Sequence, residues 1–256
     1  MKLAVSTLGT PGQPLAEAIA IALAGGCDGL ELRLHPDMGV HLDMTEAEVA
    51  AAKQAIAASG LQVLALAGYA RAAAPGTDTS VVDEIVRGLR LADALGAQGL
   101  RVFPGGSDTA AAARRIRAAL AETPGDGPRV FLETHDEMPT GDAVARVLDA
   151  ADLPRRTGAI WDILHPWRHG ESPDRTYKAL KACLGYVQIK DAVSATETVP
   201  VLLGTGAVPL RAAGELLHGA GYAGWASLEW ERTWYPQVEP VAEVLPGARR
   251  WVSEYS

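Results

Sequence analysis

The sequence predicts a single (β/α)8 TIM barrel, an α/β fold that occupies residues 1–256 as one domain. Short apolar runs alternate with longer amphipathic segments along the whole chain, and eight such runs fit the length of this barrel. No linker, charge run or low-complexity stretch separates a second domain. The segment after the first run, Leu8–Gly12, contains Pro11, which argues against the glycine-rich phosphate turn of a doubly wound sheet.

Each of the eight apolar runs is short and bounded by polar or turn-forming residues, as expected for the buried strands of a parallel barrel. In chain order, the predicted strands are Lys2–Thr7, Gly29–Leu34, Leu61–Ala67, Gly99–Phe103, Arg129–Thr134, Thr157–Asp162, Tyr186–Lys190 and Trp225–Trp230.

Between these strands, apolar residues recur at spacings of three and four, which is typical of amphipathic helices. The clearest predicted helices are Pro14–Ala24, Thr45–Ala58, Ser80–Leu95 and Thr140–Ala151. Thr45 precedes Glu46 and Glu48, two acidic residues that suit the positive end of a helix. Gly60 and Gly96 follow predicted helix ends, where a left-handed backbone is favoured.

Composition limits the function and the location of the protein. A formal net charge of −8 argues against binding to nucleic acid or to an anionic membrane surface, since both require a basic face. The two cysteines, Cys27 and Cys183, lie far apart and form neither a disulfide framework nor a zinc motif. No apolar stretch is long enough to be a signal peptide or to cross a bilayer. We therefore expect a cytoplasmic protein.

Four consecutive predicted strands end in polar side chains. The alternation of side chains along a strand places Glu133 with His135 on one face, and Gln188 with Lys190 on another. In a barrel, function lies at the carboxyl ends of the strands. If these faces point into the barrel mouth, four groups converge in one pocket: Glu133, Asp162, Gln188 and Glu229.

Several carboxylates cannot remain ionised close together without a cation or a shared proton. A divalent metal is the simplest solution, and an all-oxygen donor set favours Mg²⁺ or Mn²⁺ over Zn²⁺. His135 and His165 are available as nitrogen ligands in addition. At any single position the alternative is an ion pair, with Lys190 or Arg33 as the partner. One divalent ion, Mn²⁺ or Mg²⁺, is the predicted cofactor.

The sequence resembles the xylose isomerase-like TIM-barrel family of sugar isomerases and epimerases over nearly its whole length. The matching segments are Gly26–Leu32, Leu132–His135, Trp161–Pro166, Ile189–Asp191, Gly204–Gly206 and Ser227–Glu231. The resemblance implies that Glu133, Asp162, Gln188 and Glu229 hold the metal. Family members carry a histidine where this chain has Gln188, whose carbonyl is a weaker ligand. The resemblance also implies a small carbohydrate-like substrate and a homo-oligomer.

The same residues suggest a mechanism that begins with proton abstraction beside a carbonyl. A metal that chelates the adjacent oxygens of a hydroxy-ketone acidifies the neighbouring C–H and stabilises the resulting enediolate. Glu133 and Glu229 are the predicted acid and base, one removing a proton and the other returning it. His165 is expected to hydrogen-bond a substrate oxygen or to shuttle the proton. Lys190 is expected to offset the enediolate charge, with an ion pair to a carboxylate as the alternative.

Further residues are candidates for substrate contact. Glu31 and Arg33 lie at the end of the second strand, and His135 at the end of the fifth. Trp161 and Trp230 offer flat rings that suit the apolar faces of a sugar.

Two other features allow both a functional and a structural interpretation. The Gly204–Gly206 segment is a candidate for binding phosphate through backbone N–H groups, although a simple turn explains the same glycines. For Trp225 and Trp251, packing between barrel and helices, or a dimer contact, is the favoured role.

Three alternative functions remain open at this stage. The same segments also look like 3-dehydroshikimate dehydratases, which are lyases, and like the metal-bearing subunit of C-glycoside-cleaving enzymes, which needs a partner chain. A sugar-binding barrel without catalysis is the third alternative, and Gln188 is the residue that favours it. Endonuclease IV shares the barrel, but the acidic net charge and six scattered histidines argue against that function.

Overall fold

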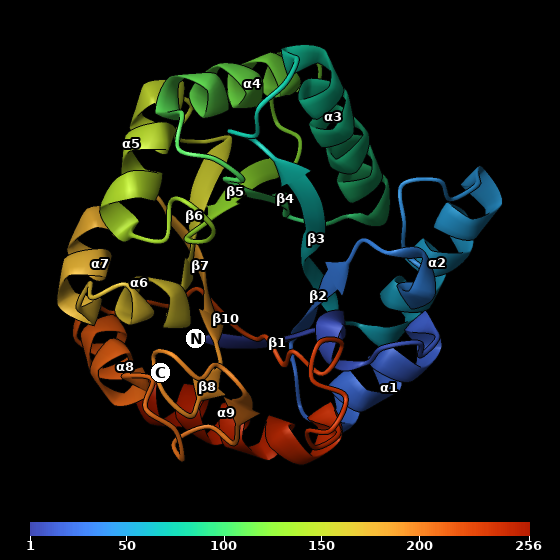
Figure 1. The fold of residues 1–256 in the computed structure, drawn as a ribbon. Coiled ribbons are helices and arrows are strands. Elements are labelled where there is room, and N and C mark those ends of the chain that lie inside the picture. Colours follow the sequence, from blue (N-terminus) through green and yellow to red (C-terminus); the bar gives the residue numbers. More distant parts are fainter.

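The computed structural model describes all residues 1–256 and contains a closed barrel of eight parallel strands. The barrel strands are β1 (Lys2–Ser6), β2 (Gly29–Arg33), β3 (Gln62–Arg71), β4 (Gly99–Phe103), β5 (Arg129–Glu133), β6 (Thr157–Asp162), β7 (Leu184–Ile189) and β10 (Trp225–Leu228). They pair in the order β1-β10-β7-β6-β5-β4-β3-β2, so the last strand closes on the first. Figure 1 shows these strands in the middle of the molecule with the helices around them. The predicted (β/α)8 TIM barrel is confirmed.

The helices that cover the barrel follow the strands in sequence. They are α1 (Leu15–Ala24), α2 (Glu46–Ser59), α3 (Asp78–Leu95), α4 (Thr109–Ala121), α5 (Gly141–Ala151), α6 (Leu164–Arg168), α7 (Pro173–Leu180), α8 (Leu210–Gly219) and α9 (Val241–Tyr255). Helix α2 begins with a capping box, in which Thr45 and Glu48 satisfy each other's backbone N–H groups. Gly60 and Gly96 end α2 and α3 with the expected left-handed backbone. None of the helices combines the length and apolar composition needed to span a bilayer.

The boundaries of some elements differ from those expected. Strand β3 continues to Arg71, four residues beyond the predicted end, and Arg71 pairs with Phe103 of β4 after a register shift beyond Ala67. Strand β10 ends at Leu228, although the Glu229 N–H still donates to the Ile189 carbonyl at 3.1 Å. A small antiparallel pair, β8 (Asp191–Ala192) and β9 (Pro200–Val201), follows β7. Strands of two residues leave no periodic signal in a sequence.

Aromatic side chains fill the interior of the barrel below the carboxyl ends of its strands. Phe131 and Tyr186 meet edge to face, with ring centroids 5.3 Å apart, and Trp225 belongs to the same buried cluster. Trp225 therefore lies inside the barrel, and the expectation that it packs between barrel and helices was wrong. Trp251 does lie in the large outer core, where its indole N–H donates to the Leu210 carbonyl.

Glycines make room for these rings. A Cβ atom placed on Gly99 would lie 2.3 Å from Phe131 Cε2 and 2.6 Å from the Arg129 carbonyl oxygen. The position opposite Phe131 on β6 is also a glycine, Gly158, where a Cβ would lie 3.1 Å from the same ring. The barrel thus accommodates a large ring because the neighbouring strands carry glycines where the ring packs against them.

The substitution Gly99→Ala is expected to lower the free energy of unfolding by about 1–3 kcal/mol. Its methyl group collides with Phe131 and with a backbone oxygen that cannot rotate away. Chemical denaturation of Gly99→Ala, Phe131→Leu and the double variant measures the coupling free energy between positions 99 and 131. We expect Gly99→Ala to lower the free energy of unfolding by less in the Phe131→Leu background than in wild type. An equal loss in both backgrounds would contradict a clash between the added methyl group and the Phe131 ring.

Candidate active site

Three carboxylates meet at the carboxyl end of the barrel. Glu133 ends β5, Asp162 ends β6, and Glu229 follows β10; all three are buried. One oxygen from each carboxylate lies within 4.8 Å of the others. Above them is a cavity of about 490 Å³, a size suited to a small molecule. The residues that line it are Leu8, Tyr69, Arg71, Arg101, Phe103, Glu133, His135, Asp136, Lys190, Glu229, Glu231 and Trp234.

One of two buried cations at this cluster is Lys190. Its Nζ lies 2.7 Å from Asp162 Oδ2 and 2.6 Å from Glu231 Oε1, and it also donates to Glu229. The ammonium therefore bridges three carboxylates. Asp162 and Glu229 belong to the carboxylate cluster, whereas Glu231 lines the cavity outside it. Lys190 therefore connects the cluster to the cavity wall.

The second buried cation is Arg101 on β4. Its Nη1 lies 3.3 Å from Glu133 Oε2 and 3.2 Å from Glu229 Oε1. Its Nε and Nη2 donate to the Gly68 carbonyl at 3.3 and 3.2 Å. These bonds fix the guanidinium between the two glutamates.

Gln188 connects the carboxylate cluster to a deeper carboxylate, Glu31. Its Nε2 donates to Glu31 Oε1 at 2.9 Å and to Glu229 Oε1 at 3.1 Å. Glu31 also accepts hydrogen bonds from the Tyr186 hydroxyl at 3.1 Å and the Ser227 hydroxyl at 2.6 Å. These partners hold Glu31 beneath the cluster and outside the lining of the cavity.

The charges at the site do not balance. Five carboxylates, including Glu31 and Glu231, surround only two buried cations. Burial raises the pKa of Glu133 to about 8 and that of Asp162 to about 6, with repulsion from Glu229 adding to both shifts. Burial also opposes ionisation of Glu229, but Lys190 and Arg101 outweigh it and lower its pKa. The cluster therefore requires shared protons or a further cation.

The donor set fits a hard divalent cation. Three carboxylates supply oxygen atoms within reach of one ion. Glu133 Oε2 and Gln188 Oε1 are buried and accept no hydrogen bond, which leaves their lone pairs free for a ligand. Excess negative charge and oxygens that accept no hydrogen bond at the same place both favour such an ion.

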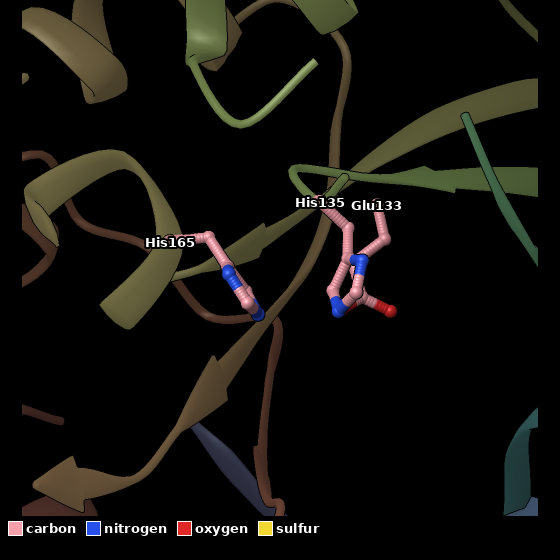
Figure 2. Close-up of side chains that lie close together, drawn as sticks. All are labelled: Glu133, His135 and His165. Carbon is pink, nitrogen blue, oxygen red and sulfur yellow. The ribbon is translucent and has the colours of Figure 1, made fainter. Parts of the chain in front are cut away.

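Two histidines lie beside Glu133, as Figure 2 shows. The rings of His135 and His165 are 4.2 Å apart, and both offer nitrogens within 4.8 Å of a Glu133 oxygen. Burial disfavours the charged form of both rings. For His135, the hydrogen bond to Asp136 at 2.7 Å and the charges of Glu133 and Asp136 together outweigh burial and raise the pKa. Burial lowers the pKa of His165 well below its usual value. Compared with a free histidine, His135 therefore holds a proton more readily and His165 less readily.

Comparison with known proteins identifies the family. The sequence profile of the xylose isomerase-like TIM barrel family matches residues 19–254. The chain belongs to this family. No curated protein sequence matches the chain significantly.

Several solved structures share this fold. The probable 3-DHS dehydratase AsbF from Bacillus anthracis is 18% identical, with 99% of each chain covered and a TM-score of 0.79. The IolI protein, solved with a bound zinc atom, is 17% identical, with 100% of this chain and 99% of that chain covered and a TM-score of 0.82. D-psicose 3-epimerase from Clostridium cellulolyticum H10, solved with D-tagatose, is 15% identical over 100% of this chain and 99% of its own, with a TM-score of 0.74.

Some residues of the cavity were not expected from the sequence. Arg101 is the most important of these, since it contacts two of the three cluster carboxylates. It stands between Gly99 and Phe103 in a short apolar run, and the alternation of a strand places all three on the inner face. A charged residue in the middle of a buried strand was therefore the signal.

The structure does not bring the predicted tryptophans to the cavity. Trp161 and Trp230 lie in the large core outside the barrel, where Trp230 donates to the Glu239 carbonyl at 2.8 Å. Because Trp161 is adjacent to Asp162 on one strand, it must face the opposite side. Trp234, which is 57% exposed, lines the cavity instead.

Arg33 lies beside the cavity without lining it. Its Nε donates to the Tyr69 hydroxyl at 2.6 Å, and its Nη1 donates to Asp37 at 3.0 Å. The guanidinium also lies 5.4 Å from the centre of the Trp234 ring. Arg33 therefore supports two residues of the rim, Tyr69 and Trp234.

The Gly204–Gly206 turn already has an anion, which comes from the chain itself. Asp191 Oδ2 accepts hydrogen bonds from Gly204 N at 2.8 Å and Gly206 N at 3.0 Å. Its Oδ1 accepts from Ala192 N and Val208 N at 2.9 and 3.1 Å. The backbone groups expected to bind phosphate are thus occupied, and the turn interpretation is the correct one.

The metal-free protein is expected to lose stability as the pH rises. In the unfolded chain Glu133 ionises around 4.5, but in the folded chain its pKa is about 8. Its contribution to stability is therefore complete below the lower value and is lost as the pH passes through the higher one. Melting temperatures measured in chelator should fall by roughly 5–10 °C across this range.

The variant Glu133→Gln provides the control for this pH dependence, because its side chain cannot ionise. Its melting temperature should vary less with pH, and Mn²⁺ should flatten the wild-type curve in the same way by replacing the proton. Identical slopes in wild type and variant would show that Glu133 is not the titrating group.

Proposed function

We propose that this protein is a divalent-metal-dependent isomerase or epimerase that acts on a sugar, a sugar phosphate or a similar polyhydroxylated ketone. The observation that carries the proposal is the cluster of Glu133, Asp162 and Glu229, whose negative charge exceeds that of its cations, at the floor of a small-molecule cavity. Several structural relatives are named as sugar epimerases, which supports this class of substrate.

The proposed metal ligands are the carboxylates of the cluster and the free carbonyl oxygen of Gln188. Mn²⁺ or Mg²⁺ suits these oxygen donors. When bound, the ion would polarise the substrate carbonyl and make the neighbouring C–H more acidic. The N–H groups of Gly204 and Gly206 already bind Asp191, so this turn does not support a phosphate on the substrate. A sugar phosphate would need other residues to bind its phosphate.

We assign the proton-transfer roles to the two glutamates that Arg101 holds together. Glu229 has a lowered pKa and is ionised, so it is the proposed base that removes the proton. Glu133, which contacts the same Arg101 Nη1 as Glu229, is the proposed group that returns the proton, and its raised pKa belongs to the metal-free protein. We assign His165, which lies beside Glu133 and outside the cavity lining, the role of binding a substrate oxygen, and Lys190 the role of offsetting the charge that develops on it.

A lyase of the same family is the second candidate, and the histidine pair favours it. Elimination of water requires one group that removes a proton and another that protonates the leaving hydroxyl. His165, whose pKa is lowered, and His135, whose pKa is raised, lie side by side and match these two requirements. The probable dehydratase among the relatives supports this alternative.

One experiment separates these functions. The Mn²⁺-loaded protein is incubated in D₂O with a panel of ketoses, their phosphates and 3-dehydroshikimate, and the products are followed by NMR and ultraviolet absorption. An isomerase or epimerase gives an isomer with deuterium at the reacting carbon. A lyase gives a conjugated, absorbing product. Binding without deuterium exchange would instead indicate a barrel that does not catalyse, and no binding at all would contradict the proposed substrate class.

The matched variants for this screen are Glu133→Gln and Glu137→Gln. Glu137 is exposed on the loop after β5 and has no contact with the cluster. Exchange should be lost in the first variant and kept in the second.

A further inference from the structure

Lys190 and the proposed metal compete for the same oxygens. The ammonium lies 2.7 Å from Asp162 Oδ2 and donates to Glu229, and both residues belong to the proposed ligand set. A divalent ion bound to these carboxylates would lie a few ångströms from the ammonium, where two cations repel each other strongly. The metal and the ammonium in its present position therefore compete for Asp162 and Glu229.

The structure offers Lys190 one other partner. Glu231 Oε1 lies 2.6 Å from the ammonium, and Glu231 is outside the group of carboxylates that meet around one ion. The Glu231 side chain is more accessible than the cluster, with 18% of its surface exposed, and it lines the cavity. The flexible lysine stem allows the ammonium to move while the backbone stays in place.

The backbone at Lys190 is in fact fixed. The next residue, Asp191, is buried and accepts four backbone hydrogen bonds from its own and the following loop. Any response of Lys190 to a metal must therefore come from its side chain.

We propose that Lys190 is an exchangeable internal counterion, which neutralises Asp162 and Glu229 in the metal-free protein and keeps only its contact with Glu231 when a divalent ion binds. Glu231 is then a positioning residue that acts through Lys190. Release of Asp162 and Glu229 leaves the ammonium beside the cavity, where it faces a bound substrate. This inference rests on the metal site of the proposed function.

The test is a thermodynamic cycle with Mn²⁺ alone as the probe, measured by isothermal titration calorimetry at constant pH. Lys190→Met removes the competitor and should bind Mn²⁺ at least about tenfold more tightly than wild type. Glu231→Gln removes the alternative partner and should bind about tenfold more weakly. In the Lys190→Met background, Glu231→Gln should change the affinity by less than about threefold.

Two controls keep the outcomes distinct. Arg71→Gln removes a cavity cation whose nearest carboxylate is Asp136, at 3.9 Å, so it reports the effect of net charge alone. Circular dichroism and melting curves establish that each variant is folded before titration.

Each outcome decides the question. If wild type binds Mn²⁺ and Lys190→Met binds it equally or more weakly, the proposed role of Lys190 as an exchangeable counterion is refuted. The proposed metal site is then still supported. If Glu231→Gln changes the Mn²⁺ affinity equally in wild type and in Lys190→Met, the role of Lys190 as an exchangeable counterion is also refuted. If wild type binds no Mn²⁺ but Lys190→Met does, Lys190 is a permanent substitute for the ion, and both the exchange and metal dependence fail. If neither protein binds Mn²⁺, the metal site itself is refuted.

Discussion

The variant Glu229→Ala is expected to lose bound metal and to lower turnover by about 10²–10⁴-fold. Glu229 is a carboxylate that both buried cations contact, since it accepts from Arg101 at 3.2 Å and from Lys190, and it also accepts from Gln188 at 3.1 Å. Its removal takes away a proposed ligand and the proposed base together. The remaining carboxylates lose the central member that holds the two buried cations in place.

Metal content measured by plasma mass spectrometry tests this expectation. Wild type should carry about one equivalent of Mn²⁺ or Mg²⁺, and both Glu229→Ala and Glu133→Ala should carry none. Glu137→Ala, an exposed glutamate on the same face of the barrel, should keep it. If wild type stays metal-free after soaking in excess Mn²⁺, the enolisation mechanism is refuted.

The variant Asp191→Ala is expected to lower the free energy of unfolding by about 3 kcal/mol, or roughly 6–12 °C in melting temperature. The Asp191 carboxylate is buried and accepts hydrogen bonds from four backbone N–H groups. Alanine leaves all four donors without an acceptor, and the loop that carries Gly204 and Gly206 loses its only charged anchor within the turn.

Hydrogen exchange localises this effect. Amides of residues 200–208 should exchange faster in Asp191→Ala, while those of β5 and β6 should keep their protection. Asp191→Asn keeps the shape and one acceptor oxygen, so its loss of stability should be smaller. Uniformly faster exchange over the whole barrel would mean that the loop is not a separate unit.

The fold and the carboxylate cluster could be predicted because both follow from simple periodicities. Eight apolar runs alternating with amphipathic segments define the barrel, and the two-residue alternation brings Glu133 and its counterparts to one end. The metal and the proton-transfer roles of these residues remain predictions.

The errors have physical reasons. The roles expected of Trp161 and Trp230 came from residue type, although each follows or precedes an inward-facing carboxylate and must therefore point outward. The four hydrogen bonds of Asp191 join residues up to 17 positions apart, so no local sequence pattern predicts them. Arg101 was detectable, since a charge inside an apolar strand requires buried partners.

The aromatic floor of the barrel has a consequence for the order of events in a catalytic cycle. Phe131, Tyr186 and Trp225 fill the bore beneath the carboxylate cluster, so the cavity opens to solvent at one end only. An ion bound at the floor must enter before the ligand that covers it, and a product must leave before the next substrate arrives. For the proposed metal site, this geometry predicts an ordered sequence in which the metal binds before the organic ligand, and it predicts that product competes with substrate for the cavity.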